Sequence, residues 1–192
     1  EGTFNAAFIP SYTASKIEGK KKGKAFADEV LSLLFFILIF LVTLAEIFTP
    51  YLVYIIAPGF IEDDNKFNLA IEFTRITFPF LLFVSLSSFF SGILNSNNKF
   101  AAASAAPIIL NVVLIVSILI AYNLNLDIAK KLSYGVTIAG IIQLVFLIYV
   151  TDKYYKPRVK IKLKVSKKVK FFFRKLIPSI LSSGVTQINI LV

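Results

Sequence analysis

The sequence predicts an all-α protein, a polytopic bundle of transmembrane helices, on three observations. Apolar residues make up 57% of the 192 residues, with a mean hydropathy of +0.77. They come in long blocks almost without charge, and the Lys, Arg, Asp and Glu residues cluster between the blocks. Roughly 20 such residues in a helix cross the apolar core of a bilayer. We therefore expect about five spans and a short helical remnant at the N-terminus.

Five segments are long enough to span and carry at most one charged residue each. They cover residues 30–48, 76–94, 100–122, 133–150 and 176–192. The second and third segments form the clearest feature, a hairpin of two uncharged arms joined by the polar turn Asn95-Ser96-Asn97-Asn98-Lys99. The other spans are placed by counting outward along the chain from this hairpin.

The basic residues predict the orientation of the spans. Lys and Arg total 17 in the loops at 11–29, 95–99 and 151–175, against 4 in the loops at 60–75 and 123–132. Cytoplasmic loops of membrane proteins carry the excess of Lys and Arg. The first three loops are therefore predicted to be cytoplasmic, and the other two to lie outside.

The composition excludes several classes of function. The chain has no Cys, which excludes disulfides and thiol nucleophiles, and no His, the commonest general base and metal ligand. No catalytic motif is present, so we expect neither an enzyme nor a site for a cofactor or metal. The net charge of +10 lies in loops tethered to spans, which argues against nucleic acid. The absence of Met, and an end inside an apolar run, predict an internal piece of a longer protein.

Polar residues inside the spans are the candidates for lining a substrate cavity. Pro107 has no N–H, so it leaves the carbonyl of Ala103 without its helical hydrogen bond within the span. Asn111 lies one turn further along, on the same face of the helix. Asn111 either lines a polar cavity beside a kinked helix or makes a hydrogen bond between helices. The same two alternatives hold for Gln143, in the middle of the fourth span.

The last span carries a polar stripe that should not face lipid. Ser183 and Gln187 are its candidates for substrate contact, with helix packing as the alternative. The stripe comprises Ser179, Ser182, Ser183, Thr186 and Gln187.

Small residues four apart predict close helix packing, at Ser88/Gly92 and Gly135/Ala139. The basic segment has two parts: residues 159–165 alternate as an extended strand does, and Ser166 can cap an interfacial helix. Residues 153–175 either bind anionic lipid headgroups or only set the topology.

Several motifs in order resemble the MurJ/MviN family of lipid II flippases, within a larger superfamily of exporters. They are EGTFNAAFIP (1–10), APGF (57–60), the hairpin with ITFP, GILN and APIILN, YGVTIAGIIQL (134–144) and LIPSILSSGVTQIN (176–189).

The resemblance implies one partial membrane domain over residues 1–192, most of the first of two lobes, in the bacterial cytoplasmic membrane. It implies that lipid II is moved between leaflets by alternating access, and it carries over Glu1 as a charged cavity residue. The second lobe, elsewhere in the same protein, would be a partner. The alternatives are export of another polyprenyl-linked oligosaccharide or a drug, and a membrane scaffold that transports nothing.

Overall fold

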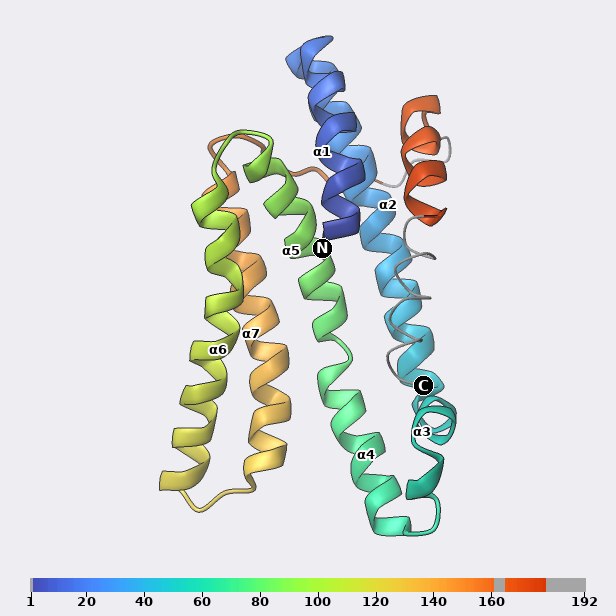
Figure 1. Ribbon diagram of the computed structural model, residues 1–192, viewed down its shortest axis with the longest axis vertical. Coiled ribbons are helices and arrows are strands. Elements are labelled where there is room, and N and C mark those ends of the chain that lie inside the picture. The colour runs from blue at the N-terminus through green and yellow to red at the C-terminus, as the bar shows by residue number, and fades with distance from the viewer. Residues whose placement is uncertain (1, 161–164, 179–192) are drawn as a thin grey trace. The chain divides into compact units, whose positions relative to one another are not determined.

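The computed structural model describes residues 2–160 and 165–178, and the regular structure in these residues is entirely helical (Figure 1). Four stretches are long and apolar enough to cross a membrane: Lys20–Ile47, Asp64–Asn95, Phe100–Asn123 and Ile128–Thr151. They overlap the first four predicted spans, and the helical structure confirms the all-α class. The fifth predicted span, 176–192, lies outside the described residues apart from its first three.

The predicted loop at 11–29 is wrong, because helices run through most of it. Helix α1 covers Gly2–Ile17 and α2 covers Lys20–Ile47. Gly19, with φ +142°, separates them. Pairs of opposite charge four residues apart, Glu18/Lys22 and Lys24/Asp28, stabilise the start of α2 although it is basic.

The predicted acidic loop at 60–75 is also mostly helical. Helix α3 (Thr49–Ile56) and the 3₁₀ turn η1 (Pro58–Phe60) lead into α4 (Asp64–Thr77). The Asp63 carboxylate caps α4, accepting hydrogen bonds from the backbone N–H groups of Asn65 and Lys66 at 3.0 and 3.2 Å. Helix α5 (Phe80–Asn95) begins directly after Pro79, and α4 and α5 together form the stretch Asp64–Asn95, which begins earlier in the chain than the predicted span 76–94.

Both ends of helix α6 lie where the hairpin predicts. Helix α6 covers Phe100–Asn123, and α7 covers Ile128–Thr151. Asn98 and Asn125 follow α5 and α6 with φ of 58° and 49°. In each turn the next N–H bonds the carbonyl five residues back (Lys99 to Leu94, Leu126 to Ala121, both 2.9 Å). This is the Schellman ending, in which Asn replaces the usual Gly.

The chain divides into two compact units, each described by itself. The first unit comprises Glu1–Leu34, Ser85–Ala103 and Leu147–Val192. Its core is aromatic: Phe8 of α1 has its ring centroid 5.0 Å from Phe89 of α5 and 6.2 Å from Phe172. All three side chains are essentially inaccessible. Gly92 of α5 faces Phe8 closely, which confirms the packing role predicted for the small residues there.

The second unit comprises Phe35–Val84 and Ser104–Phe146. Its helices α6 and α7 run side by side (Figure 1) and approach at Gly135, where an added Cβ would lie 2.5 Å from Ser117 Oγ. One face of α6 is apolar and exposed, through Ile108, Val112, Ile115 and Leu119. Such a face suits contact with lipid rather than water.

Ser166 begins a last described helix, as the sequence predicts. Residues 167–178 are helical, and the Ser166 hydroxyl accepts a hydrogen bond from the Val169 N–H at 3.4 Å. This is the N-cap geometry, three residues into the helix. Residues 161–164 of the predicted extended segment lie outside the described residues.

Candidate functional site

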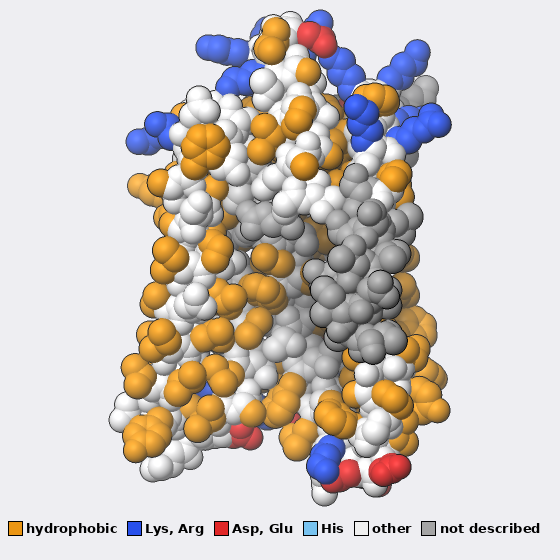
Figure 2. Space-filling view, in the orientation of Figure 1, with side chains coloured by type: hydrophobic (Ala, Val, Ile, Leu, Met, Phe, Trp, Pro, Cys, Tyr) orange, Lys and Arg blue, Asp and Glu red, His pale blue; other side chains and the backbone are white. Residues whose placement is uncertain are grey.

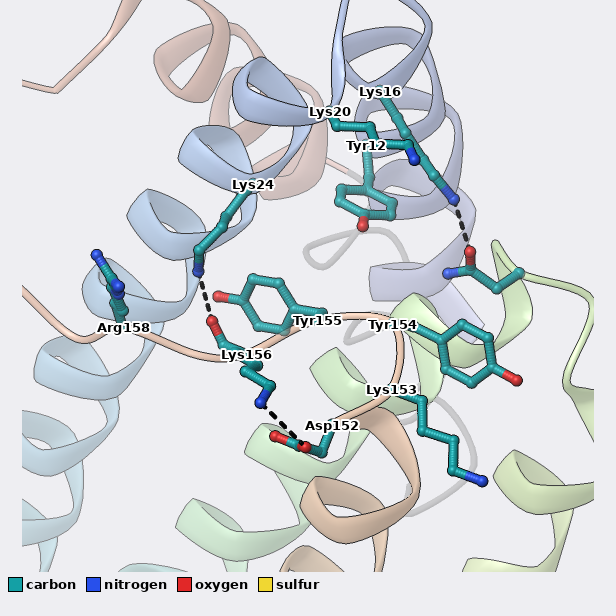
Figure 3. Close-up of a pocket in the computed structure, with 11 residues that line it drawn as sticks. Tyr12, Lys16, Lys20, Lys24, Asp152, Lys153, Tyr154, Tyr155, Lys156 and Arg158 are labelled. Carbon is teal, nitrogen blue, oxygen red and sulfur yellow. Dashed lines mark hydrogen bonds and ion pairs between the residues drawn. The ribbon is translucent and has the colours of Figure 1, made fainter.

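The first unit contains a cationic pocket of about 550 Å³. Three segments far apart in the sequence form it: the corner between α1 and α2, the turn after α5, and the chain that follows α7 (Figure 3). Its lining residues are Tyr12, Lys16, Lys20, Lys24, Asn97, Asp152, Lys153, Tyr154, Tyr155, Lys156 and Arg158.

The lining carries six cationic side chains against one carboxylate, Asp152. Figure 2 shows Lys and Arg side chains gathered at the end of the first unit where the pocket lies. Lys16 donates to Asn97 Oδ1 at 2.6 Å, which ties α1 to the turn after α5. Lys156 reaches Asp152 at 3.7 Å, a separation at which exposed ion pairs contribute little. The pocket therefore keeps a positive potential that would attract anions.

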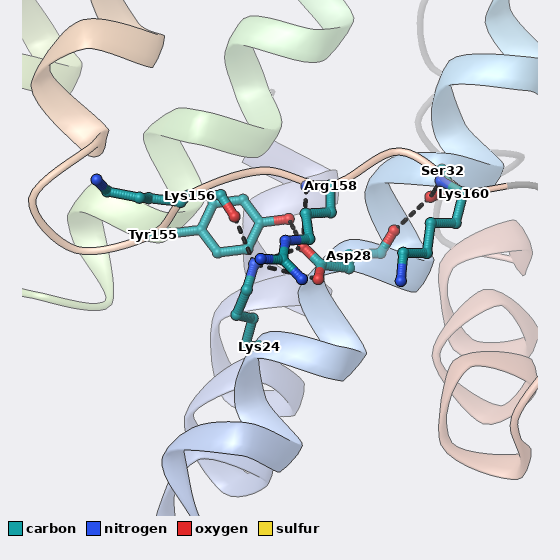
Figure 4. A network of polar contacts seen from close by, with 7 residues as sticks. All are labelled: Lys24, Asp28, Ser32, Tyr155, Lys156, Arg158 and Lys160. Atoms are coloured by element: carbon teal, nitrogen blue, oxygen red, sulfur yellow. Dashed lines mark hydrogen bonds and ion pairs between the residues drawn. The ribbon is translucent and has the colours of Figure 1, made fainter.

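The carboxylate of Asp28, on α2, links several groups of the pocket (Figure 4). It accepts hydrogen bonds from the Tyr155 hydroxyl at 2.7 Å, from the Arg158 backbone N–H at 3.2 Å and from Lys24 Nζ at 3.2 Å. Lys24 Nζ also donates to the carbonyl of Lys156 and lies 5.0 Å from the centroid of the Tyr155 ring. One carboxylate thus holds both Lys24 and the backbone segment that carries Lys153, Lys156 and Arg158.

Two more side chains of α2 bind the segment after α7 along the helix. Ser32, one turn after Asp28, accepts a hydrogen bond from the Lys160 N–H at 3.0 Å. The Glu29 carboxylate accepts one from the Ser166 N–H. Side chains of a helix therefore satisfy the backbone donors of a segment that has no strand partner within the described residues, so the segment is held without a sheet.

Burial and the Asp28 carboxylate raise the pKa of the Tyr155 hydroxyl well above its ordinary value near 10. The unfolded chain would ionise this tyrosine first, so its contribution to stability is complete below pH 10 and is lost as the pH rises further. We expect stability to fall above pH 10 by up to about 1.4 kcal/mol per pH unit from this group. Thermal unfolding of the purified protein in detergent between pH 9 and 11 measures it.

The stability of the Tyr155→Phe variant should fall less steeply above pH 10, because this hydroxyl is absent. Tyr154, 40% exposed, provides the control, because Tyr154→Phe removes a neighbouring hydroxyl without touching Asp28. Equal slopes in Tyr155→Phe and the unmodified protein would contradict the assignment.

A second set of charges lies beside the pocket on the same unit. Glu18, between α1 and α2, pairs with Lys22 at 3.4 Å and with Lys168 of the last described helix. These hydrogen bonds and charges lower the pKa of Glu18. Lys22 and Lys168 thus pair with a carboxylate, whereas Lys20 and Lys153 of the pocket form no ion pair with any described residue.

Two of the five predicted site residues are described, and both lie in the second unit. Gln143 of α7 is buried, and its amide donates to the carbonyl of Ala106 at 2.8 Å, one residue before Pro107. Asn111 of α6 is exposed, and its side chain hydrogen-bonds no described residue. Glu1, Ser183 and Gln187 lie outside the described residues.

The sequence did not predict the cationic pocket as one site. It did predict that the two basic loops, 11–29 and 151–175, share the cytoplasmic side, and this was the signal available. What it could not supply was the pairing of Asp28 with Tyr155, 127 residues apart in the chain.

Comparison with known proteins supports one family. The sequence profile described as "Lipid II flippase MurJ" matches residues 1–192. A probable lipid II flippase MurJ of Rickettsia prowazekii is 38% identical over 192 residues, covering all of this chain and 38% of that protein. One from Rhizobium tropici is 37% identical, covering all of this chain and 37% of that protein.

A lipid II flippase MurJ of Burkholderia cenocepacia is 32% identical over 145 residues, covering 74% of this chain and 28% of that protein. The chain thus spans less than two fifths of the length of the two relatives that match all of it. The profile match covers residues 1–192, which include all four described spans and every residue that lines the cationic pocket. The chain belongs to the lipid II flippase MurJ family.

Proposed function

We propose that the protein containing this chain is a lipid II flippase of the bacterial cytoplasmic membrane. It would move the lipid-linked peptidoglycan precursor from the inner to the outer leaflet by alternating access between two lobes. The observation that carries the proposal is the family match along all 192 residues. The four apolar spans support it, because alternating access requires a membrane-embedded bundle.

The polar residues of the spans are the proposed cavity side chains. Asn111 supports this role best: an amide on an exposed helix face within an apolar span needs a polar partner, since leaving it unpaired in hydrocarbon costs a few kcal/mol (roughly 2–7 by transfer scales). Substrate or cavity water would supply that partner. Glu1, Ser183 and Gln187 are proposed to line the same cavity. Gln143 is proposed to contact it from its position beside Ala106.

Two further partners belong to the proposal. Anionic lipid headgroups would attract residues 153–175, at about 1 kcal/mol for each Lys or Arg near the membrane surface. A second lobe of the same protein would complete the transport pathway, as in other transporters built from two halves.

Rescue of depleted cells tests the function. The full-length protein, expressed in bacteria depleted of their own lipid II flippase, should restore growth and cell shape. Failure to rescue, with the protein inserted in the membrane at normal abundance, would count against lipid II as the substrate. It would favour another polyprenyl-linked oligosaccharide or a drug.

A pair of substitutions separates transport from scaffolding in the same cells. Asn111→Leu and Gln187→Leu should each reduce rescue at least tenfold in plating efficiency while the protein stays folded and in the membrane. A scaffold would tolerate both, because leucine packs well in a membrane helix. Ile115→Leu, one turn after Asn111 on α6, is the control that should leave rescue unchanged.

A further inference from the structure

Three cations of the cationic pocket have no counter-charge. Lys20, Lys153 and the guanidinium of Arg158 form no ion pair with any residue that the structure describes. Close by on the same unit, Lys22 and Lys168 are both paired with Glu18. Like charges that line one pocket repel each other, and an anion bound in it reduces that repulsion.

The frame of the pocket is already fixed without a ligand. Asp28 holds Lys24, Tyr155 and the backbone of Arg158, and Asn97 holds Lys16. A site whose walls are held in this way loses little conformational entropy on binding. The three cations without an ion pair favour an anion with several acceptor oxygens. The planar guanidinium of Arg158 can donate hydrogen bonds to two phosphate oxygens at once.

The depth of the pocket along the spans selects an anion carried by a lipid. Lys153 lies two residues after the end of α7 at Thr151. Lys24 precedes Val30, where the apolar part of α2 begins, by six residues, or roughly 9 Å of helix. The headgroup layer is about 5–8 Å thick on each side of the apolar core, so Lys153 lies within it and the backbone of Lys24 lies just beyond it. Tyr154, 40% exposed, has the amphipathic character favoured at that level.

We infer that the cationic pocket binds the phosphate of a lipid headgroup, attracted by its unpaired cations Lys20, Lys153 and Arg158. The chemistry is shared by two sources, the phosphodiester of an anionic bilayer lipid and the pyrophosphate of a polyprenyl-linked precursor. The inference deepens the proposed function by assigning headgroup binding to one pocket, and its second source rests on that function. The volume of about 550 Å³ accommodates a phosphate with its adjoining glycerol or sugar.

Calorimetric titration of the full-length protein in neutral detergent tests this site with three probes. They are dihexanoyl phosphatidylglycerol, farnesyl pyrophosphate and inorganic pyrophosphate. We expect saturable binding of at least one lipid probe. The double variant Lys20→Gln/Arg158→Gln should weaken it about 25-fold, since each cation near an anionic group contributes about fivefold. Lys153→Gln should weaken it about fivefold.

The matched control is Lys22→Gln/Lys168→Gln, which removes two positive charges outside the pocket and should change the Kd less than twofold. Equal weakening by both double variants would show that net charge alone attracts the probe and would overturn the site. Absence of saturable binding of either lipid probe would overturn it as well. Thermal unfolding of each variant checks folding; if the double variant is misfolded, Lys153→Gln carries the test.

The three probes identify the source of the phosphate. Preference for phosphatidylglycerol assigns the pocket to bilayer lipid, and preference for farnesyl pyrophosphate assigns it to the precursor. Tighter binding of inorganic pyrophosphate than of both lipid probes would refute a lipid headgroup site. This result can be distinguished from that of the rescue experiment. If the protein rescues depleted cells but binds neither lipid probe, the proposed binding site is refuted. If it binds a lipid probe but does not rescue, only the proposed flippase function is refuted.

Discussion

Gly92→Leu should remove the native packing of the first unit. An added Cβ at Gly92 would lie 2.7 Å from Phe8 Cδ1 and 2.7 Å from Asn5 Oδ1. Phe8 cannot move aside, because its ring is fully buried against Phe89 and Phe172. Overpacking of this kind costs about 3 kcal/mol or more when the neighbours cannot yield. We expect the apparent melting temperature in detergent to fall by roughly 6–12 °C.

Gly59 provides the control for this substitution. It lies in the exposed turn η1, with no atom within 4 Å of an added Cβ. Gly59→Leu should therefore change the melting temperature by no more than about 2 °C, as expected for an exposed surface position. Gly92→Leu with an unchanged melting temperature would show that α1 does not pack on α5 through Phe8.

Asp28→Ala should release the segment that follows α7. The substitution leaves the buried Tyr155 hydroxyl, the Arg158 N–H and Lys24 without their shared acceptor. Removing one partner of a buried ion pair costs about 3–5 kcal/mol, and solvent reduces this where the pair is accessible. The side chains of Lys24 and Asp28 are 37% and 17% exposed, so we expect a loss of about 2–4 kcal/mol. Thermal unfolding and the rate of trypsin cleavage after Arg158 and Lys160 measure it.

Asp152→Ala is the matched control, since it removes a carboxylate from the same pocket. The pair between Asp152 and Lys156 spans 3.7 Å, with both side chains more than half exposed. Such pairs contribute at most about 1 kcal/mol. Faster cleavage in Asp28→Ala than in Asp152→Ala is expected. Equal cleavage rates would contradict the anchoring role of Asp28.

The boundaries of α6 were predictable because local chemistry defines them. The uncharged run begins after Lys99 and ends near Tyr122, and Asn98 and Asn125 supply the left-handed residues that end α5 and α6. The start of α2 was not predictable in the same way. A run of lysines around two glycines favours a loop, but Gly23 remains helical and packs against Lys16. A Cβ added at Gly23 would lie only 2.9 Å from the Cα of Lys16. That close approach is a tertiary contact.

Of the predicted cavity residues, only Gln143 gained a described partner. A polar side chain in an apolar span must find a hydrogen bond, and the sequence indicated this need for both Gln143 and Asn111. Which backbone carbonyl Gln143 meets depends on how α7 packs on α6, here beside Pro107 at Ala106. The period of a helix gives the face on which a residue lies, and does not give the atom it meets.

The sequence by itself determined the membrane class, the four described spans, the cap at Ser166 and the basic character of two predicted cytoplasmic loops. These depend on hydrophobicity, charge and turn chemistry within a few residues of each other. The tertiary structure decided that Lys16, Lys20 and Lys24 share one pocket with Lys153 and Arg158, and that Asp28 anchors it through Tyr155. The reason is physical: contacts between residues more than 100 positions apart depend on how the helices pack, which no local pattern specifies.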